Sequence, residues 1–306
     1  MRDRDEPFHP PLGGQSAISR SASAIVQTGD WVASTDVPMD NVVPFERPDR
    51  LIDRAARCTT LVRVAGLLEH IGSRAKLTGN GNLRLADVRA LAERFGCAEL
   101  VDPVIGDTKF RTPSSVGNVP VDLIFRWARS AGFVRVVHGS VLRTARGKRI
   151  GADPMDDWSR LFDAFVRKLR WPETSLNGWH APRYFWLGEV SDAIGRSLRA
   201  VAHARGEPVW VMDIAIGIVL DLGKRYDLSS LPEHIFNDLP RDVAWALRVW
   251  AFEPLGELDV VRLEGPITDP EMNAVLGPGA PKEYRVRSTP LGARAVAGLG
   301  SDVTGE

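Results

Sequence analysis

The sequence predicts a mainly helical α+β protein, and three observations lead to that class. Apolar residues recur every three or four positions in several long segments, which is the spacing of amphipathic helices. Short β-prone runs flank turns or glycine-rich segments at two places. The 306 residues are 44% hydrophobic, and 39 basic residues balance 39 acidic ones. This composition is typical of a globular protein and gives no overall attraction to nucleic acid.

The N-terminal segment, residues 1–48, is rich in Pro, Ser, Gly and Asp and has few periodic apolar positions. We expect a disordered leader there, without the apolar stretch of a signal peptide. The longest apolar run, Val209 to Leu222, is interrupted by Asp213 and is too short to span a bilayer. We therefore expect a cytoplasmic protein that makes no use of a membrane.

Residues 49–152 contain the elements of a first unit. Its first helix should start near Leu51 or Thr59. Three segments with helical spacing of apolar residues are each followed by a glycine, a residue that often ends a helix. These segments end at Gly72, Gly96 and Gly132. A polar loop is expected from Asp107 to Pro120, before the third helix.

A β-hairpin should follow the third helix. The β-prone runs 133–137 and 141–144 are separated by His138-Gly139-Ser140, a short turn that contains glycine. A short strand and a turn over 77–82 precede the second helix. The predicted order is thus helix, strand, helix, helix and hairpin, which is the order of elements in a winged helix-turn-helix. We therefore predict a winged-helix-like unit.

Residues 153–206 are expected to form a helical connector. Asp153-Pro154 has the form of a helix N-cap followed by proline in the first turn. Aromatic residues are frequent between Trp171 and Trp186. Such a group could stack single-stranded bases, but sealing a junction between two domains is the simpler interpretation.

Residues 207–306 partly repeat the element order of the first unit. A buried helix is expected from Val209, another helix should open at Pro240, and strands are expected over 258–263 and 284–287. A terminal helix should begin near Thr289. The sequence thus predicts a second winged-helix-like unit, although the two halves share little sequence identity.

Basic side chains concentrate in the first unit, because no acidic residue occurs between Arg126 and Ile150. Guanidinium and ammonium groups on an exposed edge can bind phosphates. The candidate nucleic-acid-binding residues are Arg126, Arg129, Arg135, Arg143, Arg146, Lys148 and Arg149. DNA is the expected partner and RNA the lesser alternative. The competing interpretation is a solvated hairpin edge, since charged residues commonly protect edge strands.

The second unit has a different charge balance. From Arg241 to Glu264 there are three arginines and five acidic residues. Such a surface repels phosphate, so we expect this unit to pack on its neighbour or on a partner protein, including a second copy of the chain. A scaffold or dimerisation module is therefore the alternative to a nucleic-acid-binding protein.

No motif indicates an enzyme, a metal site or a cofactor. The two cysteines, Cys58 and Cys97, form no CxxC pattern, and the six histidines lack metal-ligand spacing. Gly79 to Asn82 lacks the lysine of a phosphate-binding loop. A ligand pocket around Trp179 to Trp186 is a third hypothesis, which has no nucleophile or base to support it.

Two segments resemble a family of uncharacterised proteins from high-GC Gram-positive bacteria, some of them from plasmid-borne open reading frames. The segments are Leu77 to Leu91 and Trp127 to Thr144. Ser288-Thr289-Pro290-Leu291-Gly292 also resembles the close of a winged-helix unit in bacterial regulators. The resemblance covers most of 58–299 and implies tandem winged-helix-like units. Some relatives carry a cysteine-rich metal motif that this chain lacks, and the family implies no catalytic residues.

Overall fold

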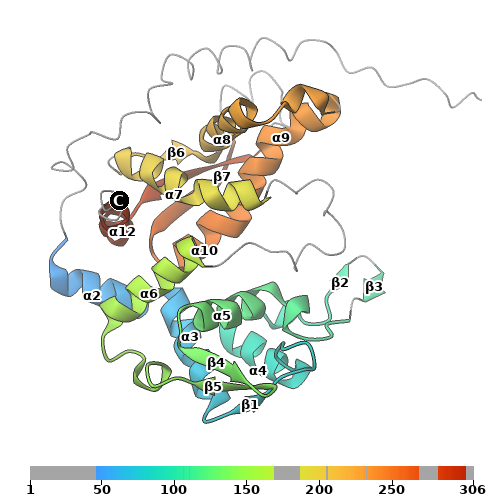
Figure 1. Cartoon of the computed structure of the whole chain (residues 1–306), viewed down its shortest axis with the longest axis vertical. Helices are drawn as coiled ribbons and strands as arrows, with labels where there is room; N and C mark the ends of the chain where they lie inside the picture. Colours follow the sequence, from blue (N-terminus) through green and yellow to red (C-terminus); the bar gives the residue numbers. More distant parts are fainter. Residues whose placement is uncertain are drawn as a thin grey trace, which may run out of the picture. The chain divides into compact units, whose positions relative to one another are not determined.

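The computed structural model describes residues 46–300 except 106, 110, 169–186, 205, 232 and 269–281. Within these residues the predicted class is confirmed, because helices dominate and the sheets are small and antiparallel (Figure 1). Residues 1–45 of the predicted leader and the aromatic segment from Trp171 to Trp186 lie outside the described residues.

Two helices occupy the region in which one was expected to begin. Helix α2 spans Pro48–Arg57 and α3 spans Thr59–Ile71. Cys58 separates them with an extended backbone, at φ −63° and ψ 139°. Gly72 ends α3 with a positive φ of 58°, as its position in the sequence predicted.

The next two helices are joined by a long connection. Helix α4 spans Leu85–Phe95 and ends at a left-handed Gly96, whereas α5 spans Val119–Ser130 and is capped by the side chain of Asn118. The connection holds 3-10 turns at Ala98–Leu100 (η3) and Ser115–Gly117 (η4). It also holds a short hairpin that the sequence did not predict, β2 (Val104–Ile105) with β3 (Thr108–Lys109).

A three-stranded sheet follows, with the order β1-β5-β4. Its strands are β1 (Ala75–Lys76), β4 (Val134–Val137) and β5 (Ser140–Arg143). The hairpin turn has two residues rather than the expected three, because Ser140 already pairs with Val137. His138 and Gly139 have φ values of 46° and 67°, as a tight primed turn requires.

Helix α6 (Pro154–Arg167) begins as predicted, since the carboxylate of Asp153 accepts a hydrogen bond from the N–H of Asp156 at 3.0 Å. It packs against α5. The indole N–H of Trp127 donates to the carbonyl oxygen of Leu161 at 2.6 Å, and the rings of Trp127 and Phe165 are 4.9 Å apart. A 3-10 turn, η5 (Gly147–Arg149), lies between β5 and α6.

The second half of the described chain has its own helices and sheet. In chain order its elements are α7 (Leu187–His203), β6 (Val209–Trp210), α8 (Val211–Arg225), the 3-10 turn η7 (Leu228–Ser230), α9 (Glu233–Ala246), the π-helical η8 (Leu247–Phe252), α10 (Glu253–Glu257), β7 (Val261–Thr268), β8 (Lys282–Ser288) and α12 (Pro290–Gly300). From here on the first unit is α3 to η5 and the second unit is α7 to α12, so α7, which was expected in the connector, is counted with the second unit.

Two expectations for the second unit are wrong. The helix expected from Val209 begins at Val211, because Val209 and Trp210 pair with β8 as a strand. The helix expected to open at Pro240 begins at Glu233, so Pro240 lies inside α9. Apolar periodicity alone does not distinguish a short buried strand from the first turn of a helix.

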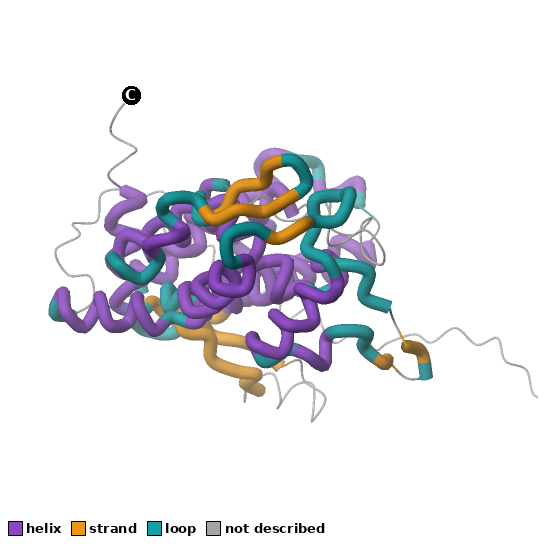
Figure 2. The backbone as a smooth tube through the Cα atoms, turned by 90° about the horizontal axis from the view of Figure 1, so that it is seen from below, coloured by secondary structure: helices purple, strands orange, loops and turns teal. Residues whose placement is uncertain are grey.

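The second sheet repeats the topology of the first. Its strand order is β6-β8-β7, so the short early strand again pairs with the last strand of the hairpin. Figure 2 shows both sheets among the helices. Helix α7 occupies the place in the second unit that α3 occupies in the first, because each immediately precedes the short strand.

The repeat extends to single hydrogen bonds at the end of each hairpin. Thr144 N donates to the oxygen of Phe133 at 3.0 Å, and Thr289 N donates to the oxygen of Val260 at 3.1 Å. Each threonine hydroxyl also accepts a hydrogen bond from the glycine three residues later, Gly147 at 3.1 Å and Gly292 at 3.0 Å. We call this arrangement the threonine clasp.

The two units share one continuous core. The indole N–H of Trp158 donates to the oxygen of Leu258 at 2.7 Å. Arg54 of α2 donates to both carboxylate oxygens of Asp259, at 2.8 and 2.9 Å. Bidentate pairing of this kind fixes orientation as well as distance. Helix α2, through Arg54, and helix α6, through Trp158, therefore each form a specific hydrogen-bonded contact with the second unit.

Candidate nucleic-acid interface

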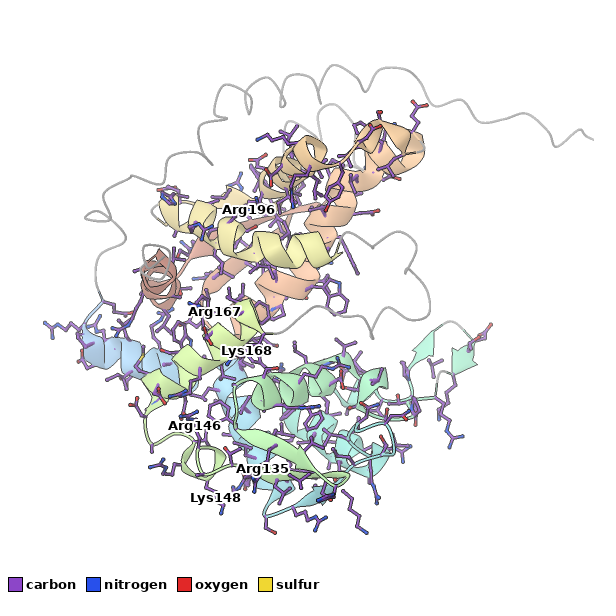
Figure 3. The ribbon with its side chains drawn as sticks, viewed as in Figure 1. Arg135, Arg146, Lys148, Arg167, Lys168 and Arg196 are labelled. Carbon is purple, nitrogen blue, oxygen red and sulfur yellow. The ribbon has the colours of Figure 1, made fainter. Side chains whose placement is uncertain are left out.

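The sequence-predicted cations are spread over α5, the hairpin and the turn after it. Figure 3 labels Arg135 on β4, and Arg146 and Lys148 on the segment after β5. The side chains of Arg129, Arg135, Lys148 and Arg149 are exposed, and that of Arg146 is half-buried. Within the described residues none of these five pairs with a carboxylate. The other labelled cations differ, because Arg167, Lys168 and Arg196 form ion pairs with Asp163 or Asp221.

The segment after β5 lies directly against the start of β4. A Cβ atom on Gly147 would lie 2.1 Å from the carbonyl oxygen of Phe133, so the two backbones are in contact there. Arg146 and Lys148 flank Gly147, and Arg135 lies two residues beyond Phe133. The fold thus brings the cations of the turn after β5 close to β4, the strand that carries Arg135.

One exposed cation that the sequence did not point to, Lys76, joins this group from β1. Lys76 pairs with Ser140 across β1 and β5, and Ser140 pairs with Val137 across β5 and β4. Directly paired residues point to the same side of a sheet, so Lys76 shares a face with Arg135. The short strand predicted before α4 began only at residue 77, whereas β1 is Ala75–Lys76, and its partner strand could not be predicted.

We call Lys76, Arg135, Arg146, Lys148 and Arg149 the basic wing surface. Phosphate contacts need cations that are accessible and not already neutralised, and these side chains meet that requirement within the described residues. Long side chains on a sheet and an adjoining turn can adjust to a phosphate backbone without a preformed cavity.

Arg126 does not belong to this surface. Its Nε donates to a carboxylate oxygen of Asp122 at 2.5 Å, and the other oxygen of that buried carboxylate accepts from the hydroxyl of Ser115 at 2.8 Å. Arg126 therefore neutralises a buried acid and helps to hold the connection before α5 in place. Its charge is already compensated.

Arg143 is also placed differently from the prediction. It pairs directly with Val134, which is buried, so both side chains lie on the core side of the sheet. The Nε atom of Arg143 is buried and has no hydrogen-bond partner among the described residues. This side chain bears on stability more than on contact with a ligand.

Helix α5 offers little surface for a DNA groove. Within its twelve residues only Val119 and Arg129 are exposed, because α3, α4 and α6 pack against the helix. A recognition helix needs several free polar side chains to read base edges. The sheet and the turn after it, rather than α5, are therefore the parts of the first unit best placed to touch nucleic acid.

Acidic residues limit the basic wing surface on the α6 side. Asp157 accepts a hydrogen bond from the N–H of Gly151 at 2.7 Å. Burial raises the pKa of Asp157, and the nearby charges of Asp156 and Asp153 raise it further, while Arg146 partly opposes them. The charge of Arg146 is thus partly offset by these carboxylates.

Other kinds of site find no support in the part of the chain that the structure describes. No group of three or more His, Cys, Asp or Glu residues is arranged to hold a metal there. Burial raises the pKa of the Cys58 thiol to about 11, which leaves it protonated and unreactive. Among the same residues, no helix combines the length and apolar character needed to cross a membrane.

No protein-family model, curated protein or solved structure matches the chain. The resemblance to a family of high-GC Gram-positive bacteria therefore stays a prediction.

Proposed function

We propose that the chain is a non-enzymatic nucleic-acid-binding or regulatory protein, in which the first unit acts as a winged helix and the basic wing surface contacts the phosphates of DNA. The observation that carries this proposal is the set of cations on β1, on β4 and in the turn after β5, four of the five exposed, without carboxylate partners among the described residues. A cytoplasmic location is part of the same proposal.

The topology supports the winged-helix assignment. Three helices precede a hairpin, and the short strand after the first helix pairs with the last strand of that hairpin. The long connection between α4 and α5 and the buried surface of α5 depart from a compact helix-turn-helix. We therefore assign contact to the wing and expect it to be governed by phosphates, with little discrimination between sequences.

Fluorescence anisotropy with a labelled duplex tests the proposal. Arg135→Glu combined with Lys148→Glu should weaken binding at least about tenfold, because two favourable phosphate contacts become repulsive. The matched control is Arg199→Glu with Lys224→Glu, the same change of charge at exposed positions of α7 and α8. Equal affinity of the two double variants would contradict the proposal.

A scaffold or dimerisation role is the second candidate, and one observation favours it. Leu220 on α8 and Phe236 on α9 are each 46% exposed, although both are large apolar side chains. Exposed apolar groups on packed helices can contact a partner protein. Light scattering after size-exclusion chromatography separates the candidates, because this role requires a stable dimer and no retention of DNA at low salt.

A further inference from the structure

The outer face of the second sheet carries a group of arginines and a tryptophan. Arg262 pairs with Arg287 across β7 and β8, and Arg285 pairs with both Glu264 of β7 and Trp210 of β6. Because directly paired residues point to the same side, all five side chains share one face. We call Trp210, Arg262, Glu264, Arg285 and Arg287 the arginine–tryptophan face.

The opposite side of this sheet faces the core. Val209, Val261 and Val286 are all buried there, and α7 and α8 pack against β8. On the arginine–tryptophan face, Arg262 is exposed and the others are partly exposed. The alternation of apolar and polar positions thus separates a core face from an outer face.

The charges on this face are only partly neutralised. Arg287 forms an ion pair with Glu264, at 3.0 Å. Arg285 is also a direct neighbour of Glu264, but its guanidinium lies over the indole ring of Trp210, 3.9 Å from the ring centre. Within the described residues neither Arg285 nor Arg262 pairs with a carboxylate. Glu283 lies further along β8, beyond a shift in the β7–β8 register between Glu264 and Ile267.

A guanidinium held over an indole ring presents a planar cationic surface. Unpaired bases stack on aromatic rings and on arginine planes, and their phosphates add charge attraction. A carboxylate of an acidic protein would pair with arginine without needing the ring. The combination of stacked and free arginines therefore favours a single-stranded nucleic acid over an acidic protein.

The internal repeat places the arginine–tryptophan face at the position in the second sheet that corresponds to the outer face of the first sheet. The matched threonine clasps align Arg135 of the first unit with Arg262 of the second, since each lies two residues after the clasped carbonyl. The same alignment places Trp210 at the position of Lys76, and Arg285 at that of Ser140. The second sheet thus has more guanidinium groups on its outer face than the first.

We infer that the arginine–tryptophan face is a binding site for single-stranded nucleic acid, separate from the basic wing surface. The acidic excess noted in the second unit applies to the segment from Arg241 to Glu264. Arg285 and Arg287 lie on β8, outside that segment. This inference does not require that the first unit binds a duplex.

A labelled oligothymidylate tests the inference in the full chain, read by fluorescence anisotropy at low salt. Arg262→Glu combined with Arg285→Glu should weaken binding at least about tenfold. The control Arg199→Glu with Lys224→Glu should leave this affinity within about twofold, and Arg135→Glu with Lys148→Glu should weaken it less than Arg262→Glu with Arg285→Glu does. Failure of the wild-type chain to bind, or equal losses in all three double variants, would overturn the inference.

Two further variants separate stacking from charge and from loss of folding. Arg285→Lys keeps the charge but loses the planar group, so it should recover only part of the affinity lost in Arg285→Glu. Binding should quench tryptophan fluorescence in the wild type and quench it less in Trp210→Phe. Circular dichroism must show the same helix content in every variant. Full recovery by Arg285→Lys together with unchanged quenching in Trp210→Phe would contradict a stacking site.

Failure of the single-strand inference can be distinguished from failure of the proposed duplex binding. The duplex assay responds mainly to Arg135 and Lys148, whereas the single-strand assay responds mainly to Arg262 and Arg285. Loss of duplex binding alone leaves the inference standing. If the duplex itself binds through Arg262 and Arg285 while oligothymidylate does not bind, the assignment to single strands is wrong.

Discussion

Replacement of Gly292 by alanine tests the threonine clasp most sharply. A Cβ atom at this position would lie 1.9 Å from the carbonyl oxygen of Val260, whereas ordinary contacts begin near 3.4 Å. The start of α12 must therefore move by more than about 1 Å. That movement stretches two hydrogen bonds, from Thr289 N to Val260 O and from Gly292 N to the Thr289 hydroxyl.

The expected cost follows from these contacts. Two weakened hydrogen bonds amount to about 2 kcal/mol, and overpacking adds about 1–3 kcal/mol. Gly292→Ala should therefore lower the free energy of unfolding by about 3–5 kcal/mol. Gly147→Ala should lower it by a similar amount, since its Cβ would lie 2.1 Å from the oxygen of Phe133.

Urea unfolding followed by circular dichroism measures the effect. The matched control is Gly217→Ala on α8, where a Cβ would meet nothing within 4 Å. That variant should gain about 0.5–1 kcal/mol, because alanine favours a helix interior. Wild-type stability in Gly292→Ala would refute the reasoning, as would a loss in Gly217→Ala equal to that in Gly292→Ala.

Three other substitutions have definite expected results. Arg143→Met should raise the free energy of unfolding by about 1 kcal/mol, because it removes a buried N–H without a partner, and should leave duplex affinity unchanged; lower stability in urea would contradict this. Trp158→Phe should cost about 2 kcal/mol, because the oxygen of Leu258 loses its buried donor; an unchanged urea midpoint would show that this bond contributes nothing. Burial raises the pKa of Asp157, so the folded state binds its proton more tightly than the unfolded state does. Relative to Asp157→Asn, the wild type should become more stable as the pH falls from about 7 through that raised pKa, and the opposite trend would contradict the assignment.

The ends of several helices could be predicted because local residues determine them. Gly72 and Gly96 both have positive φ, and Asp153 caps α6 through its own side chain. Pro240 misled the prediction because proline is most frequent in the first turn of a helix, whereas this one lies inside α9. Val209 and Trp210 form a strand only because β8, over seventy residues later, supplies their partners.

The candidate sites show the same division between local and long-range information. The basic stretch after Arg126 was visible in the sequence, but the ion pair that occupies Arg126 and the burial of the Arg143 Nε atom were not. The arginine–tryptophan face required the register of three strands. Arg262 and Arg285 become neighbours only when β7 and β8 pair, since the intervening segment is long.

The salt dependence of duplex binding tests the central claim most directly. Each phosphate neutralised by a protein cation contributes about 0.9 to the slope of log affinity against log salt concentration. The basic wing surface therefore predicts that Arg135→Glu with Lys148→Glu reduces the magnitude of this slope by about 2 between about 50 and 200 mM salt. An identical slope and affinity in the wild type and this double variant would contradict the claim that the wing binds DNA.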